Sequence, residues 1–135
     1  YTTDDEGNVE INYSSDTTVL DDVSNQVTAF GRIKEGMRAC VTRDQGTCHS
    51  YWSTKSYTTW AKTCTAEIYD YPDTENDYPN HLQIGYIAAD ESSEPVLVFA
   101  CLAFRQTYAS NGGSSSAPLV SSQVVDKYVE KYGVN

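Results

Sequence analysis

Three long stretches of the chain predict β-strands, the first by its alternation of apolar and polar residues. The first runs from Thr58 to near Tyr71, and the others cover 81–88 and 96–105. A period of two is typical of a strand with one buried face. Lys62 is the exception on the apolar side of the first stretch. The third stretch (VLVFACLAF) is apolar on both faces, so we expect it to be central and covered on both sides.

Two other stretches carry apolar residues at every third or fourth position, the spacing of a helix with one buried stripe. The first predicts a helix at about 17–34 that is stopped by Gly36. The second predicts a helix that opens at 116–118, with Pro118 in its first turn, and ends at Gly133. Each apolar stripe needs a sheet face to cover it.

Shorter segments complete the predicted order of elements. Alternation at 9–13 and an apolar run at 37–42 predict two short strands. We expect residues 1–8 to be flexible and the Ser/Gly-rich stretch 110–116 to be a loop too short to link domains. The order β-α-β-β-β-β-α predicts one α+β domain over 1–135, with a mostly antiparallel sheet of four to five strands packed with two amphipathic helices.

Composition narrows the class of protein. The chain has 135 residues, 9 Lys+Arg and 19 Asp+Glu, and its net charge of −10 disfavours attraction to nucleic acid. No stretch approaches the roughly 18 apolar residues of a membrane span. Residues 31–67 carry six bases and three acids between two acidic blocks. These blocks either neutralise one another across the fold or dock an oppositely charged partner.

The chain holds four cysteines, Cys40, Cys48, Cys64 and Cys101. None forms a Cys-x-x-Cys pair, and only His49 and His81 could complete a zinc site, so two disulfides are favoured over a metal site or free thiols. Three pairings are open. Disulfides persist in oxidising compartments.

A secreted glycoprotein is therefore expected. Asn12-Tyr13-Ser14 is an N-glycosylation sequon, and Ser and Thr together number 28 of 135 residues. The sequence starts at Tyr1 and shows no signal peptide, which is typical of a mature exported chain.

Two clusters could carry chemistry. Acid–base cleavage of RNA needs a base, an acid and a cation for the phosphate, and the candidates are His49, Glu67, His81 and Arg105. Calcium prefers carboxylate oxygens, and an acidic loop offers Asp70, Asp73, Glu75 and Asp77, although it departs from the EF-hand pattern. No nucleophile elbow or phosphate-binding loop occurs, so we expect no catalytic residue, metal or cofactor, with the ribonuclease set as the alternative.

Aromatic residues interleaved with Ser and Thr predict a binding surface, because such rings give a large contact area at low entropic cost. The candidates are Tyr51, Trp52, Tyr57, Trp60, Tyr69, Tyr71 and Tyr78. Each ring could instead be a core residue or part of a cross-strand pair.

The four cysteines and the predicted β-α-β-β-β-β-α order resemble those of small secreted effectors and killer-toxin-like proteins of fungi. The resemblance implies a non-enzymatic, virulence-related interaction protein that acts outside the producing cell or inside a host. We then expect its Tyr/Trp-rich strands to bind a host or target protein, or a glycan. The alternatives are a small secreted ribonuclease or other hydrolase, and a lectin-like or inhibitor module.

Overall fold

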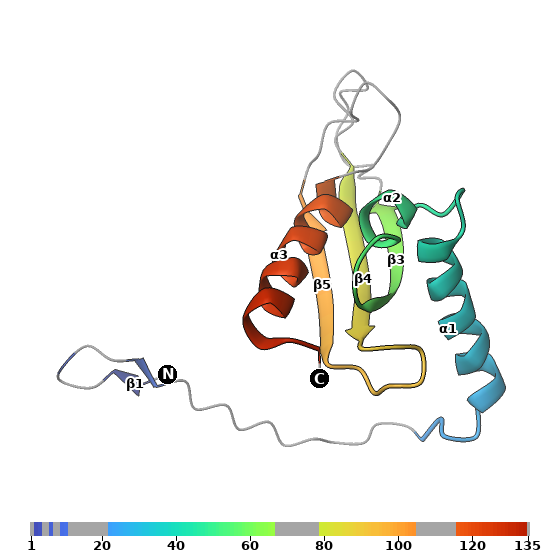
Figure 1. Ribbon diagram of the computed structural model, residues 1–135, viewed down its shortest axis with the longest axis horizontal. Helices are drawn as coiled ribbons and strands as arrows, with labels where there is room; N and C mark the ends of the chain where they lie inside the picture. Colours follow the sequence, from blue (N-terminus) through green and yellow to red (C-terminus); the bar gives the residue numbers. More distant parts are fainter. Residues whose placement is uncertain are drawn as a thin grey trace.

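The protein is a mixed α/β structure with three helices and a three-stranded antiparallel sheet (Figure 1). The computed structural model describes residues 2–3, 6, 9–10, 22–66, 79–104 and 116–134. The elements are β1 (Thr2–Thr3), β2 (Val9–Glu10), α1 (Val27–Thr42), α2 (His49–Trp52), β3 (Thr58–Ala66), β4 (Asn80–Ala88), β5 (Leu97–Ala103) and α3 (Ser116–Tyr132). β1 and β2 pair with each other, and the main sheet has the order β3-β4-β5.

One face of the main sheet, the helix-covered face, packs against α2 and α3 (Figure 1). Its core contains Trp52 of α2, Val125 of α3 and Ile87 of β4, all nearly or fully buried. The Phe99 ring of β5 stacks on Trp52 with 5.1 Å between ring centroids. A Cβ at Gly85 would lie 2.5 Å from the Phe99 ring, so only glycine leaves room for this stack.

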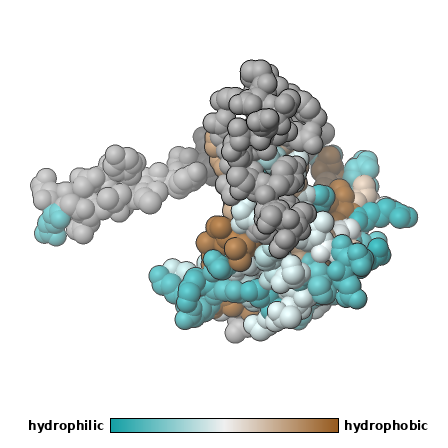
Figure 2. All heavy atoms as spheres, turned by 90° about the horizontal axis from the view of Figure 1, so that it is seen from above, coloured by the Kyte–Doolittle hydropathy of each residue, from teal (hydrophilic) through white to brown (hydrophobic). Residues whose placement is uncertain are grey.

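The opposite face, the open face, carries exposed apolar side chains. The strand register places Trp60, Tyr86 and Val98 in one row across the sheet. Trp60 is only 2% exposed because α1 lies beside β3, whereas Val98 is 75% exposed. Other large exposed apolar residues of the sheet and of α1 are Ile84, Leu102, Phe104, Phe30 and Ile33. Apolar patches also interrupt the polar surface in Figure 2.

The later elements confirm the sequence-based expectations. β4, β5 and α3 match the predicted ranges to within about two residues, and β3 begins at Thr58 as predicted. Gly133 ends α3 with φ of 75°, and its N–H donates to the carbonyl of Val129 at 2.8 Å. This is the left-handed helix stop that glycine favours.

The first helix lies further along the chain than predicted. The side chain of Asp22 accepts a hydrogen bond from the Ser24 N–H at 2.9 Å, a local turn that competes with helix formation, and α1 starts only at Val27. The strand expected at 37–42 is wrong, because these residues form the last turns of α1 and place Val41 in the core.

Two other expectations about the sheet are corrected. The main sheet has three described strands rather than four or five, and β5 lies at its edge instead of its centre. β5 is covered on one face only, since Val98 and Leu102 are exposed. Of the loop expected at 110–116, residues 110–115 lie outside the described residues and Ser116 begins α3; most of residues 1–8 also lie outside the described residues. Within the described part of the chain, no helix is long and apolar enough to cross a bilayer.

Candidate functional site

A lysine stands on the open face of the sheet, where its neighbours are apolar. Lys62 of β3 lies opposite Ile84, and its neighbours along the same face of the strand are Trp60 and Cys64. Its side chain is exposed, and its Nζ donates to the carbonyl of Thr63. Since nothing in the packing of β3 requires a cation here, Lys62 is a candidate for binding an anionic group.

No described strand pairs with the edge of β3 beside this lysine, which is called the free edge below. Thr59 turns its carbonyl away from β4, because that oxygen accepts a hydrogen bond from Arg38 Nη1 of α1 at 3.3 Å. The carbonyl of Trp60 faces β4, where a Cβ on Gly85 would come within 2.5 Å of it. Peptide groups alternate in direction along a strand, so those of Thr63 point to the outer edge. Among the described strands, β3 pairs only with β4.

The side chain of Thr63 is linked by a series of polar contacts to Thr47 and to two cysteines. Its Oγ1 lies 2.8 Å from Oγ1 of Thr47, which in turn lies 3.1 Å from Sγ of Cys40. Cys40 Sγ is 3.2 Å from Sγ of the buried Cys48. Burial raises the pKa of the Cys48 thiol to about 12, so this sulfur stays protonated near neutral pH.

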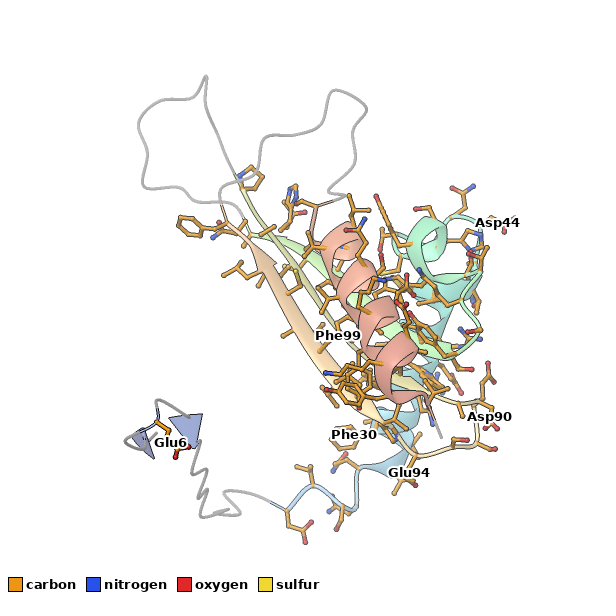
Figure 3. The ribbon with its side chains drawn as sticks, turned by 60° about the vertical axis from the view of Figure 1, so that its left-hand side comes forward. Glu6, Phe30, Asp44, Asp90, Glu94 and Phe99 are labelled. Atoms are coloured by element: carbon orange, nitrogen blue, oxygen red, sulfur yellow. The ribbon has the colours of Figure 1, made fainter. Side chains whose placement is uncertain are left out.

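A groove of about 490 Å³ is lined mainly by α1, together with Trp60 of β3 and Glu91. Lys34 Nζ and the Arg38 guanidinium lie over the Trp60 ring, 5.1 and 5.7 Å from its centroid. Arg38 also pairs with Glu91 at 2.8 Å. Glu91 belongs to the β4–β5 turn, where Asp90 and Glu94 are labelled in Figure 3. The groove is lined by three bases and two acids, so with Lys62 this side of β3 carries a small excess of positive charge.

The predicted aromatic binding surface is not formed by the described rings. Trp52 and Trp60 are buried, and so is Tyr57, which donates a hydrogen bond to Asp126 at 2.8 Å. Tyr51 is half-buried against the core. The rings are buried because they pair with other groups: Trp52 stacks on Phe99, and Trp60 stacks on Tyr86 at 4.7 Å. Three candidates lie outside the described residues: Tyr69, Tyr71 and Tyr78.

The two histidines of the predicted acid–base set are held by different elements. His49 begins α2, and its Nδ1 lies 3.0 Å from the Val41 carbonyl of α1. His81 is buried on β4, and its Nδ1 lies 3.0 Å from Oγ of Ser116, the first residue of α3. Outside the described residues lie Glu67, Arg105, Asn12 and the acidic loop Asp70, Asp73, Glu75 and Asp77. In the ranges that the structure describes, no group of three or more His, Cys, Asp or Glu could hold a metal ion.

The two predicted disulfides are not formed. All four cysteines carry free thiols, and the shortest recorded Sγ–Sγ distance is 3.2 Å, against about 2.0 Å for a bond.

Comparison with known proteins identifies the family. The family model of the penicillin binding protein transpeptidase domain matches residues 4–125. The chain belongs to this family. The crystal structure of Pseudomonas aeruginosa PBP2 in complex with WCK 5153 is similar to 96% of this chain, with a TM-score of 0.55 and 19% sequence identity. That likeness shows a shared fold, and this chain spans 24% of the PBP2 chain. No curated protein sequence matches this chain significantly.

The family overturns the functional expectations. Penicillin-binding transpeptidases are enzymes that cross-link peptidoglycan, so the resemblance to fungal effectors and killer toxins is wrong. The expectations of a non-enzymatic protein, of virulence or toxin action, and of a host protein or glycan partner are wrong for the same reason. These expectations depended on cysteine count and composition, which do not distinguish a small disulfide-bonded effector from a member of the transpeptidase family with free thiols.

Lys62 lies in a partial match to a sequence motif of the family. Penicillin-binding proteins carry the motifs Ser-x-x-Lys, Ser-Asp-Asn and Lys-Thr-Gly. In this chain Lys62-Thr63-Cys64 matches the third motif at two positions and has cysteine for glycine at the last. The first two motifs do not occur in the 135 residues. The signal visible in the sequence was the lysine that breaks the apolar alternation of β3.

Proposed function

We propose that this chain forms the substrate-binding strand of a penicillin-binding transpeptidase, together with the layer that supports it. The observation that carries the proposal is Lys62-Thr63-Cys64 on a strand with a free edge, inside the region matched by the family. The reaction needs a serine nucleophile, and we infer that it comes from a part of the domain with no counterpart in these residues.

The free edge of β3 suits an extended peptide. A peptide can add to a sheet edge through main-chain hydrogen bonds, and the outward peptide groups of Thr63 offer both a donor and an acceptor. The ammonium of Lys62 lies beside that edge and can form a charge-assisted hydrogen bond to a carboxylate. Penicillins and peptide ends both carry a carboxylate, so both would be oriented by the same two residues.

The open face offers the surface on which the nucleophile-bearing part would pack. Phe30 and Ile33 of α1 and Ile84, Val98 and Leu102 of the sheet are all exposed. Several large apolar side chains exposed on the same part of a protein are typical of an interface. Lys62 lies on the same face. A segment that carries the nucleophilic serine and packs on this face would therefore bring the serine close to Lys62.

Covalent labelling by a fluorescent penicillin tests the proposal. The assay uses the native polypeptide that contains these residues, and the variant is Lys62→Met, which removes the charge and leaves an unbranched side chain that is one atom shorter. A hydrogen bond to a charged group contributes about 1.5–3 kcal/mol, so we expect acylation to slow by about 10–100-fold. Lys131→Met, on the exposed end of α3, is the matched control and should label at the normal rate.

Two results would contradict the proposal. Either the native polypeptide takes up no penicillin, or Lys62→Met labels as fast as the unaltered protein and the Lys131→Met control.

A further inference from the structure

Two of the four thiols meet at the junction of α1 and α2. Cys40 lies in the last turns of α1, Cys48 precedes α2, and their sulfurs are 3.2 Å apart. The backbone holds them there, because the Cys48 N–H donates to the Cys40 carbonyl at 3.2 Å. A Cβ at Gly46 would lie 2.2 Å from that carbonyl oxygen, so the turn needs glycine to close this tightly.

The other two thiols cannot pair with each other. Cys64 lies opposite Leu82 on the open face, whereas Cys101 lies opposite Gln83 on the helix-covered face. Strand β4 separates them, and neighbouring strands are about 4.8 Å apart. A disulfide requires Cβ atoms within about 4.5 Å, which this arrangement excludes.

We propose that Cys40 and Cys48 form a reversible disulfide, and that no bridge between Cys64 and Cys101 accompanies it. Closing the bond from 3.2 Å requires the sulfurs to approach by about 1.2 Å, within the reach of side-chain rotation. The inference depends on sulfur geometry and does not rest on penicillin binding.

The oxidant is a disulfide, either glutathione disulfide or a thiol–disulfide oxidoreductase of an oxidising compartment. Cys40, which is partly exposed, loses its proton and attacks one sulfur of the oxidant, which releases one thiol and leaves a mixed disulfide. Cys48 then loses its proton and attacks the Cys40 sulfur, and the second thiol leaves. Two protein thiols are oxidised and one disulfide is reduced to two thiols. Gln83 Nε2 donates to Cys48 Sγ at 3.2 Å and favours the transient thiolate.

The bridge would act on the candidate site through Thr47. This residue lies inside the closed loop, and its hydroxyl contacts both Cys40 Sγ and Thr63 Oγ1. The disulfide would restrict the motion of this loop and so hold the Thr47 hydroxyl in contact with Thr63.

The test uses the native polypeptide that contains these residues, which is incubated with glutathione disulfide, then alkylated and mapped by mass spectrometry. We expect the loss of two free thiols, a cross-linked peptide joining Cys40 to Cys48, reversal by dithiothreitol, and a rise of several degrees in Tm. The double variant Cys64→Ser/Cys101→Ser should behave in the same way. Cys40→Ser should form no such cross-link.

Three results would overturn the proposal. The first is alkylation of all four cysteines of the unaltered chain after oxidation. The second is glutathione that remains on Cys40 without displacement by Cys48. The third is a cross-link that joins either cysteine to a different cysteine, or to a second copy of the chain.

Discussion

Replacing Trp60 by alanine should strongly destabilise the fold. The ring is 2% exposed, lies 4.7 Å from the Tyr86 ring, and is covered by Lys34 and Arg38 of α1. Truncation of a buried Trp costs about 3–5 kcal/mol, a sum of lost transfer energy and the cavity left behind. The stacking on Tyr86 accounts for about 0.5–1.5 kcal/mol of this, and each cation for about 0.5–1.

Urea unfolding of the 135-residue chain, followed by far-UV circular dichroism, measures the effect. With a slope of about 2 kcal/mol per M, the midpoint should fall by roughly 1.5–2.5 M. Val98→Ala is the matched control, because Val98 lies in the same row of the open face as Trp60 and is 75% exposed. Its free energy of unfolding should change by less than about 0.5 kcal/mol.

A loss below about 1 kcal/mol for Trp60→Ala would refute this reasoning. So would equal losses for Trp60→Ala and Val98→Ala. Either outcome would mean that the Trp60 ring is not part of the packing between α1 and β3.

Three further predictions test other parts of the protein. Cys64→Gly, which completes Lys-Thr-Gly, should speed penicillin acylation of the native polypeptide several-fold, because it clears the face beside the lysine. Burial and the neighbouring carboxylate raise the pKa of Tyr57, so above about pH 10 the unfolded state loses this proton first. The free energy of unfolding then falls by about 1.4 kcal/mol per pH unit, a slope that Tyr57→Phe reduces in alkaline unfolding curves. Ser121→Ala removes the donor to the buried side-chain oxygen Oε1 of Gln83 and should cost about 1–3 kcal/mol in urea unfolding. This is more than Ser122→Ala should cost, because the Ser122 hydroxyl donates to the Leu119 carbonyl within α3.

Each of these has an outcome that contradicts it. Slower acylation of Cys64→Gly would show that the cysteine serves the site. An unchanged alkaline slope for Tyr57→Phe would place that hydroxyl in water. Equal costs for Ser121→Ala and Ser122→Ala would mean that the contact with Gln83 adds no stability.

The sequence predicted the ranges of helices and strands well where the element that packs against their apolar face lies within these 135 residues. α3 and β4 pack against each other, and their apolar periodicity gave correct ranges. β5 shows the opposite case: its two apolar faces predicted cover on both sides, yet Val98 and Leu102 are exposed. Periodicity reports that a face needs a partner, but it does not report whether the partner belongs to the same 135 residues.

The predicted start of the first helix was wrong for a local reason. Apolar spacing predicted a helix that starts at residue 17. Asp22 and Ser24 form a turn instead, and the helix begins only at Val27. The apolar run at 37–42 fits a strand and a helix equally well, and the burial of Val41 against α2 decides for the helix.

The candidate site could be predicted only in part. Lys62 stands out from the alternation of β3, but a lysine and a threonine followed by cysteine form too short a motif to identify a family. The aromatic residues attracted a binding interpretation because composition does not reveal burial, and Trp52 and Trp60 are core residues. The match over residues 4–125 was needed to connect Lys62 with penicillin binding.

A crystal structure of the native polypeptide acylated by a penicillin tests the central claim most directly. The account predicts that the ligand lies along the outer edge of β3, with its carboxylate within hydrogen-bond distance of Lys62 or Thr63 and its serine attachment on a segment packed over the open face. A ligand bound away from β3, or an outer edge of β3 paired with another strand, would contradict it.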